Sequence, residues 1–281
     1  MRKYLSLIKF SHTIFAMPFA LIGFFLASQQ YIFEWVTLLY VVLSMVFARS
    51  AAMGFNRYID RDIDKKNERT AQLREIPNGT ITARNALVFV IINSLLFIAV
   101  TFIINPLCFR LSPIALIIIL GYSFTKRFTS LCHLVLGLGL SLAPIGAYLA
   151  VSNEFAIIPI LFSFVVLFWV SGFDIIYSLQ DEKFDKEQKL HSIPVLLGKK
   201  NALILSKILH LVTILILSHI GNNADFGKLY WIGFSIFSGL LIYQHTLVKH
   251  DNLEKINLAF FTTNGVSSVI FGAFVITETL L

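Results

Sequence analysis

Long apolar stretches make up most of the chain, and short polar segments separate them. Each stretch is close to the roughly 20 residues that a helix needs to cross a membrane. None alternates apolar and polar residues as the strands of a membrane barrel do. The pattern therefore predicts an all-α polytopic membrane protein with nine spans, at about 11–29, 34–55, 85–104, 107–124, 131–150, 157–178, 202–221, 228–247 and 258–280.

Composition agrees with this prediction. Hydrophobic residues make up 57% of the 281 residues and charged residues only 14%, whereas soluble domains carry about 25% charged residues. An ordinary cytosolic enzyme, a disordered protein and a disulfide-stapled secreted module are therefore excluded. The net charge of +7 comes from basic residues gathered in alternate polar segments. By the positive-inside rule we expect these segments and the N-terminus in the cytoplasm, with no nucleic-acid partner.

The second apolar stretch runs directly into an acidic segment. Asn56, Asp60 and Asp64 are spaced four residues apart, so a helix would place them on one face. Carboxylates at this spacing repel each other, and a hard cation such as Mg²⁺ removes the repulsion while leaving room for phosphate oxygens. The alternative is a solvated loop whose acids pair with basic residues of the same segment.

A second acidic face follows the sixth stretch. Asp174, Tyr177, Asp181 and Asp185 follow one another in steps of 3, 4 and 4 residues. Asp174 lies within the apolar stretch itself, where an ionisable group indicates a cavity; the alternative is a hydrogen bond between helices with no further role. Two acidic faces on the same membrane side favour a pair of divalent ions that hold one diphosphate.

Basic residues close to these faces are candidates for binding phosphate. Tyr122, Lys126 and Arg127 end the fourth stretch, Arg69 follows the first acidic face, and Lys183 lies inside the second. Lysine and arginine can bind phosphate oxygens and stabilise a departing diphosphate. The alternative is that they are ordinary charges of the cytoplasmic side.

Arg49 is the basic candidate that lies inside a predicted span. It precedes Asn56 by seven residues and so lies on nearly the same helix face. A guanidinium within a membrane helix needs an acidic partner. We expect that partner to be either Asp174, in an internal ion pair, or the carboxylate of a substrate.

The two acidic segments also indicate an internal repeat. Asp181 follows Asp60, and Asp185 follows Asp64, by the same 121 residues (181 − 60 and 185 − 64). Chance could produce such a short pattern, but the equivalent loop positions favour a repeat. We expect one domain over residues 1–281 with two four-helix halves and a ninth helix, at about 11–130, 131–250 and 258–280.

These motifs resemble those of a known family. The N-x-x-x-D-x-x-x-D motif that begins at Asn56, together with the Y-x-x-x-D-x-x-x-D motif that begins at Tyr177, is similar to the UbiA superfamily of intramembrane prenyltransferases. The resemblance extends over essentially the whole chain. The F-D-I-I-Y run that ends at Tyr177, with H-S-I-P after it, is similar to the 4-hydroxybenzoate polyprenyltransferase-like branch.

The resemblance implies a mechanism in which two Mg²⁺ ions bridge the diphosphate of a polyprenyl donor. It implies that Asn56, Asp60 and Asp64 bind one ion and that Asp181 and Asp185 bind the other. For the donor, the resemblance implies that Arg69, Lys126 and Arg127 stabilise the leaving diphosphate. For the acceptor, it implies that Arg49 anchors the carboxylate. It also implies that Asp174 or Tyr177 orients or deprotonates the acceptor hydroxyl.

The start of the chain leaves the acceptor open. Ubiquinone-pathway members of the family carry R-x-D-K-P-I-G-T near the first helix, whereas residues 8–15 here read I-K-F-S-H-T-I-F. We therefore expect either 4-hydroxybenzoate or a dihydroxynaphthoate, in quinone biosynthesis at a bacterial inner membrane. The alternatives are a membrane transporter that uses the Asp and Arg residues within the spans, or transfer to another lipid or a tetrapyrrole.

Overall fold

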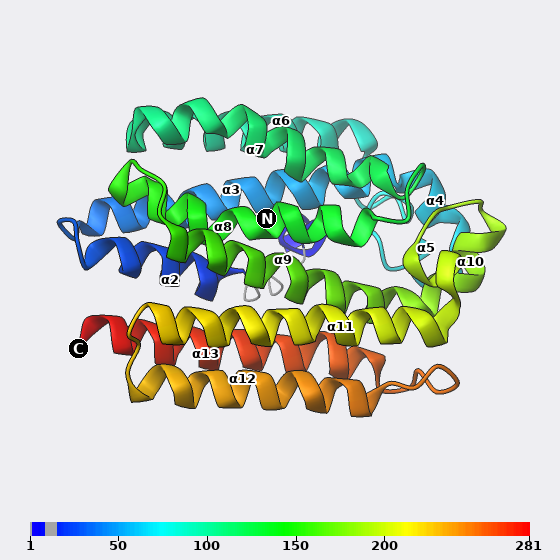
Figure 1. Cartoon of the computed structure of the whole chain (residues 1–281). Coiled ribbons are helices and arrows are strands. Elements are labelled where there is room, and N and C mark those ends of the chain that lie inside the picture. Colours follow the sequence, from blue (N-terminus) through cyan, green and yellow to red (C-terminus); the bar gives the residue numbers. More distant parts are fainter. Residues whose placement is uncertain (1, 9–15) are drawn as a thin grey trace.

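The computed structural model describes residues 2–8 and 16–281, and in this part of the chain the regular structure is helical (Figure 1). An isolated bridge between Lys249 and Asn252 is the exception. The helices are α1 (Arg2–Leu7), α2 (Met17–Ser28), α3 (Trp35–Ile59), α4 (Arg61–Lys66), α5 (Glu68–Ala71), α6 (Ala83–Ile104), α7 (Pro106–Thr125), α8 (Cys132–Ser152), α9 (Ile157–Ser178), the 3₁₀ turn η2 (Leu179–Asp181), α10 (Glu182–Glu187), α11 (Ile193–Asn223), α12 (Lys228–Leu247), the π-helical turn η3 (Leu258–Thr263) and α13 (Asn264–Leu280).

Every apolar stretch of the sequence contains a helix. Among the described residues, seven helices are long and apolar enough to cross a membrane. The other two stretches correspond to α2, which has 12 residues, and to α12, which has 20. The beginning of the first predicted span and most of the segment 8–15 lie outside the described residues.

Two helices have features that hydropathy did not predict. α11 begins at Ile193 rather than near 202, because the Ser192 side chain caps it by accepting a hydrogen bond from the Val195 N–H. Gly198, with a φ of 75°, then interrupts the helix. The last span begins with the π-helical turn η3. The Asn264 side chain donates to the carbonyl of Ala259 five residues earlier, at 3.1 Å, and so competes with the regular helical pattern.

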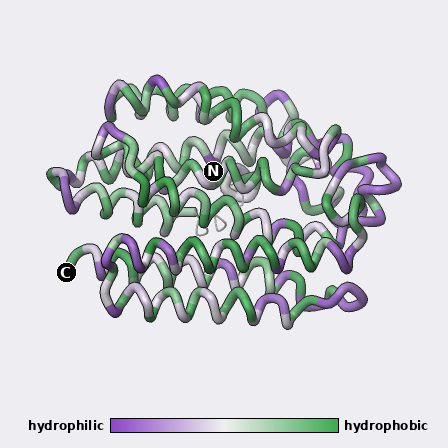
Figure 2. The backbone as a smooth tube through the Cα atoms, viewed as in Figure 1, coloured by the Kyte–Doolittle hydropathy of each residue, from purple (hydrophilic) through white to green (hydrophobic). Residues whose placement is uncertain are grey.

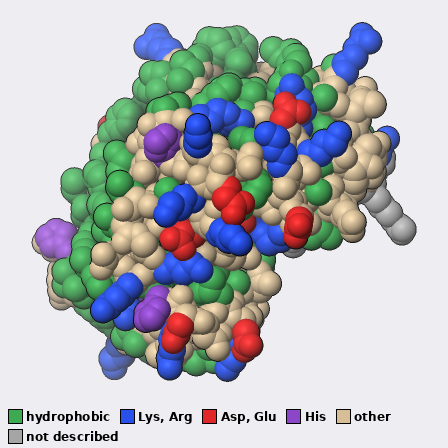
Figure 3. All heavy atoms as spheres, turned by 90° about the vertical axis from the view of Figure 1, so that its right-hand side faces the viewer, with side chains coloured by type: hydrophobic (Ala, Val, Ile, Leu, Met, Phe, Trp, Pro, Cys, Tyr) green, Lys and Arg blue, Asp and Glu red, His purple; other side chains and the backbone are tan. Residues whose placement is uncertain are grey.

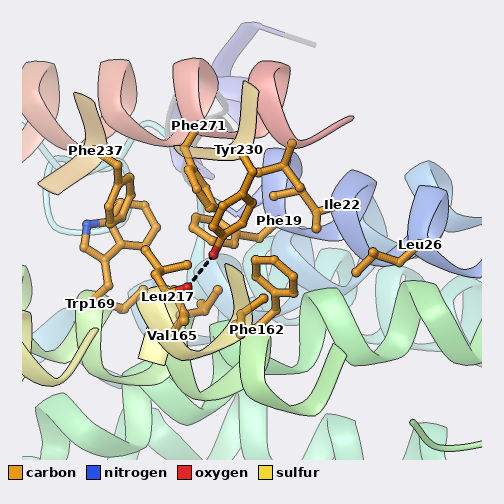
Figure 4. Close-up of a cluster of buried hydrophobic side chains, with 14 of the residues drawn as sticks. Phe19, Ile22, Leu26, Phe162, Val165, Trp169, Leu217, Tyr230, Phe237 and Phe271 are labelled. Atoms are coloured by element: carbon orange, nitrogen blue, oxygen red, sulfur yellow. Dashed lines mark hydrogen bonds between the residues drawn. The ribbon is translucent and has the colours of Figure 1, made fainter. Parts of the chain in front are cut away.

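Aromatic side chains join helices from distant parts of the chain. Phe19 of α2, Trp169 of α9 and Phe271 of α13 are fully buried in one cluster (Figure 4). The hydroxyl of Tyr230 also lies there and donates to the Leu217 carbonyl at 2.6 Å. Since lipid is as apolar as these side chains, the close packing and the satisfied hydrogen bond stabilise the bundle more than removal from water does.

Polar residues gather at one end of the bundle, where α4, α5 and α10 lie (Figures 1 and 2). Viewed from that end, basic and acidic side chains are interspersed on the surface (Figure 3). The helices between the two ends carry apolar side chains. This arrangement brings the polar segments that follow α3, α7 and α9 to the same end.

Candidate active site

The two acidic segments meet at a small polar cavity of about 60 Å³. Its lining includes both aspartates of the first segment, Asp60 and Asp64, and both of the second, Asp181 and Asp185. Basic side chains from two different segments also line it: Arg69 and Arg74 from the segment after α4, and Lys126 from the end of α7. Side chains more than 100 residues apart in the sequence therefore share one cavity.

The backbone takes the same form at the first aspartate of each segment. α3 ends at Asp60, where φ is −88° and ψ is 4°, and the 3₁₀ turn after α9 ends at Asp181, where φ is −98° and ψ is −1°. A short helix follows each aspartate. The Asp60 N–H still donates to the Asn56 carbonyl at 2.9 Å, and the Asp64 N–H to the Asp60 carbonyl at 2.7 Å. The three side chains thus keep the helical spacing across the bend.

The first pair of aspartates is held by basic residues from outside its own helix. Arg127 donates to Asp60 at 3.0 Å, and Arg74 contacts Asp64. Arg127 also donates to the Ile59 carbonyl at 3.0 Å, so its position depends on the end of α3. The alternative of a solvated loop predicted ion pairs within the same segment. Asp60 instead pairs with Arg127, which lies 67 residues later in the sequence.

The second pair has a similar environment. Arg69 donates to both oxygens of Asp181, at 2.7 and 3.3 Å, and to the Tyr177 hydroxyl at 3.2 Å. Lys126 pairs with Asp185 at 2.8 Å, and the Asp185 side chain is fully buried. Four carboxylates therefore face four cationic side chains, which leaves the cavity close to neutral before any ligand binds.

Burial shifts the pKa values of groups at this end of the bundle. Burial raises the pKa of Asp60 above its usual value, although Arg127 opposes the shift. For Lys126, burial alone would lower the pKa, but the Asp185 carboxylate outweighs it and the pKa is raised. Lys126 therefore remains a cation over the physiological range.

The amide of Asn56 faces two charged groups. Its nitrogen donates to Asp60 at 2.9 Å, and its oxygen accepts from Arg57 at 3.4 Å. In this orientation Asn56 positions the Asp60 carboxylate. The amide would have to turn over before its oxygen could face a metal ion.

Asp174 pairs with a histidine that the sequence analysis did not identify. His133 Nδ1 lies 2.7 Å from the Asp174 carboxylate. The expected ion pair between Asp174 and Arg49 is therefore wrong. The sequence gives no signal that His133 contacts Asp174, because His133 lies 41 residues earlier on another helix. It also has no metal-ligand spacing to other histidines.

Arg49 instead lines the larger cavity of the structure, which has a volume of about 370 Å³ and lies among α3, α6, α7 and α8. Almost all of its lining is apolar, and within the described chain Arg49 is its one charged lining residue. The Arg49 Nε atom is buried without a hydrogen-bond partner. Tyr122 also lines this cavity.

Residues 16–266 match the family model described as the UbiA prenyltransferase family. The chain belongs to the UbiA prenyltransferase family. It is 32% identical over 240 residues to a 4-hydroxybenzoate octaprenyltransferase of Aeromonas hydrophila. The aligned region covers 85% of this chain and 83% of the relative.

Solved structures of UbiA homologues have the same fold. The apo structure of a UbiA homologue from Aeropyrum pernix K1 is 31% identical, with a TM-score of 0.87 over 96% of this chain and 98% of the other. A UbiA homologue from Archaeoglobus fulgidus, bound to GPP and Mg²⁺, is 22% identical, with a TM-score of 0.76 over 99% of this chain and all of the other. This UbiA-family chain is thus a prenyltransferase and an all-α integral membrane protein.

Lys183 is placed differently from the other candidate residues of this prenyltransferase. Its side chain is exposed, and it lines neither of the two cavities. The helical bend at Asp181 turns α10 so that Asp185 faces inward and Lys183 outward. The expectation that Lys183 contacts the diphosphate therefore has no support in the geometry.

The cavity residues fit a divalent metal only as part of a shared site. No three His, Cys, Asp or Glu side chains converge on one point in the described part of the chain. The aspartates instead offer hard oxygen atoms in two pairs that line one polar cavity. Mg²⁺ in phosphate-binding enzymes is held by one or two carboxylates, with phosphate and water oxygens as the remaining ligands. The residues fit that kind of site.

Proposed function

We propose that this protein catalyses the Mg²⁺-dependent transfer of a polyprenyl group from a prenyl diphosphate to a hydroxylated aromatic acid in respiratory quinone biosynthesis. The meeting of two aspartate pairs at one cavity carries the proposal. The substrates named for relatives support it: one is called a 4-hydroxybenzoate octaprenyltransferase, and another was solved with GPP and Mg²⁺.

The polar cavity would bind the diphosphate. Asp60 and Asp64, helped by Asn56, would hold one Mg²⁺ ion, and Asp181 and Asp185 the other. Bound Mg²⁺ supplies positive charge that stabilises the diphosphate as a leaving group. Because each carboxylate already has a cationic partner, the substrate oxygens would take over some of those ion pairs on binding.

The basic residues of the cavity would stabilise charge on the leaving group. Arg69 and Arg127 present guanidinium groups next to Asp181 and Asp60, and Lys126 presents an ammonium group next to Asp185. Hydrogen bonds from such groups to phosphate oxygens strengthen as the carbon–oxygen bond breaks. The apolar lining of the larger cavity would keep water away from the allylic cation, which water would otherwise capture.

The larger cavity would hold the acceptor. Arg49 has no acidic partner among the described residues, so an aromatic carboxylate would satisfy its guanidinium. Tyr122 lines the same cavity as Arg49 and would contact the aromatic ring. Both 4-hydroxybenzoate and a dihydroxynaphthoate carry the required carboxylate and hydroxyl, and the tail of the donor would extend toward lipid.

We further propose that all nine predicted stretches span the membrane and form a single domain of two four-helix halves and a ninth helix, over about 11–130, 131–250 and 258–280. The matching backbone at Asp60 and Asp181 supports the repeat. The charge distribution supports an orientation with the N-terminus and the polar cavity on the cytoplasmic side of a bacterial inner membrane.

The test is a transfer assay with the purified protein in lipid vesicles. The protein is incubated with a labelled prenyl diphosphate, Mg²⁺ and a panel of aromatic acids, and the products are identified by mass. We expect a prenylated hydroxy acid that does not form when a chelator removes Mg²⁺. Absence of any prenylated aromatic acid across the panel would contradict the proposal.

A further inference from the structure

The larger cavity continues the polar cavity along two helices. On α3 the lining of the larger cavity ends at Met53, and the polar cavity begins two turns later, at Asp60. On α7 the larger cavity ends at Tyr122, and Lys126 of the polar cavity follows one turn later. A diphosphate held by the aspartates would therefore have its prenyl group at the mouth of the larger cavity.

The larger cavity is long as well as apolar. Its lining runs from Tyr122 to Cys108 on α7 and from Leu136 to Ala150 on α8. The ends lie 14 residues apart on each helix (122 − 108 and 150 − 136), or about 21 Å along the helix axis. An extended chain advances about 3.4 Å for every three bonds, so an isoprene unit, which has one bond more, advances about 4.5 Å. The cavity is therefore long enough for about four isoprene units, and an acceptor at Arg49 fills only the end near the polar cavity.

Hydrogen bonds close the end of this cavity that lies away from the aspartates. The Asn105 side chain, at the start of α7, donates to the carbonyls of Leu149 and Ala150 in the last turn of α8, at 2.8 and 3.4 Å. Its oxygen accepts the Cys108 N–H at 2.8 Å. Leu149, Ala150 and Cys108 all line the cavity. Asn105 thus ties the two helices together at this end, and a tail longer than the cavity cannot continue along the bundle.

The side of the cavity is open near Gly146. This glycine lines the cavity and is exposed, and a Cβ atom placed on it would have no other atom within 4 Å. Ile114 on α7 and Phe155 after α8 also line the cavity, and they are 54% and 57% exposed. The apolar lining therefore continues into the outer surface of the bundle, which would face lipid. Gly139, which also lines the cavity, is more enclosed, since a Cβ atom there would lie 3.7 Å from Ile119.

We propose that the isoprenoid tail of the donor lies along the larger cavity, and that Gly146 lets a long tail leave it sideways into the lipid. The proposal rests on the proposed prenyl transfer. A short tail ends inside the cavity, whereas a tail of more than about four units has to leave it. Since Asn105 closes the far end, a long tail leaves through the open space at Gly146. The absence of a side chain at Gly146 thereby determines which tail lengths the protein accepts.

The two glycines of α8 lie at different depths in the cavity. From Cys132, where α8 begins at the polar end, Gly139 is about 10 Å away along the helix and Gly146 about 21 Å. A geranyl tail has an extended length of about 9 Å. If it begins near Tyr122, it should pass Gly139 and end before Gly146. An octaprenyl tail should pass both glycines, so the two positions can be tested separately.

The experiment measures kcat/KM for octaprenyl and geranyl diphosphate with the full chain in lipid vesicles, and the readout is the ratio of the two values. In Gly146→Leu the ratio should fall roughly tenfold or more, as for an extra group in a hydrophobic pocket. In Gly139→Leu both values should fall together, which preserves the ratio. Gly239→Leu is the matched control, because Gly239 also has open space around it but lies on α12 and lines neither cavity. An unchanged ratio in Gly146→Leu, or an equal fall in Gly239→Leu, would overturn the inference.

Binding of geranyl and octaprenyl thiodiphosphate, which do not react, distinguishes this inference from the proposed function. If the protein prenylates an aromatic acid but Gly146→Leu keeps the ratio, the proposed function stands and Gly146 is not the exit. If no aromatic acid is prenylated, the proposed function fails, and weaker binding of the octaprenyl analogue alone in Gly146→Leu still supports the tail route. Equal affinities of Gly146→Leu and the unaltered protein for the octaprenyl analogue would overturn that route. Leucine favours a helix more than glycine does, so thermal unfolding in detergent should show that the variants remain folded.

Discussion

Lys126 pairs with Asp185 at 2.8 Å, while its neighbour Arg127 turns to the other aspartate segment. The short connection between α7 and α8 therefore holds both acidic segments at once. Arg69 makes the reverse link, because it follows the first segment and pairs with Asp181 of the second. These crossed ion pairs keep the two halves of the polar cavity in register before a substrate binds.

Loss of either first aspartate should abolish prenyl transfer. In Asp60→Ala or Asp181→Ala, one side of the cavity loses a carboxylate that would hold Mg²⁺, and a nearby arginine loses its partner. We expect a decrease in kcat of about 1000-fold or more, corresponding to about 4 kcal/mol of lost transition-state stabilisation. The measurement is labelled product formation in vesicles at saturating Mg²⁺. Full activity in both variants would overturn the assignment of these aspartates.

Replacement of Arg49 should affect the acceptor more than the donor. In Arg49→Ala the larger cavity loses its charged group, so the acceptor KM should rise roughly tenfold or more, as for a lost charge-assisted hydrogen bond. The donor KM should change little. Arg110→Ala is a control, because Arg110 is exposed and lines neither cavity. Equal changes in both KM values would remove Arg49 from the acceptor site.

The two lysines beside the second aspartate pair should behave differently. Lys126→Ala leaves the buried Asp185 carboxylate unpaired, which costs about 3 kcal/mol of stability, and it also removes a group that would bind the diphosphate. Lys183→Ala alters an exposed side chain and should change stability by less than about 0.5 kcal/mol. Thermal unfolding in detergent and transfer rates give both values. A larger effect from Lys183→Ala would contradict the arrangement described.

Tyr177 should contribute through its hydroxyl and its ring separately. Tyr177→Phe removes the hydrogen bond from Arg69 but keeps the ring, which packs against Phe260 in a tilted arrangement with 4.2 Å between ring centroids. We expect kcat to fall about fivefold, the equivalent of about 1 kcal/mol for one hydrogen bond. Tyr177→Ala should lower it further, since Arg69 also loses its contact with the ring. An unchanged rate in both variants would show that Arg69 needs no support from Tyr177.

Much of the fold follows from local sequence. Hydropathy predicted α9 over 157–178 and α12 over 228–247 with the ends that the structure has. The turn at Gly198 and the π-helical turn before Asn264 were not predicted, because each depends on one residue rather than on a run of apolar residues. Helix spacing placed Asn56, Asp60 and Asp64 on one face, and the bend at Asp60 keeps them there.

Contacts across the bundle could not be predicted in the same way. His133 and Asp174 lie on different helices, and the position of one residue in its helix does not predict contact with the other. Asp60, Asp181 and Asp185 also have partners from distant segments, whereas Asp64 pairs with Arg74 only ten residues away. The distant partners could not be read from local sequence. Lys183 has the expected residue type near the expected motif, but the bend after Asp181 turns it outward. Residue type identified the chemistry, and only the folded chain identified the partners.

The central claim is that both aspartate pairs hold metal ions around one diphosphate. It is tested most directly by electron paramagnetic resonance of the protein with Mn²⁺, which replaces Mg²⁺, and a non-reactive thiodiphosphate analogue of the prenyl donor. The prediction is two bound Mn²⁺ ions close enough to couple, with coupling lost in both Asp60→Ala and Asp181→Ala. Two uncoupled ions, or binding that is unchanged in either variant, would contradict the claim.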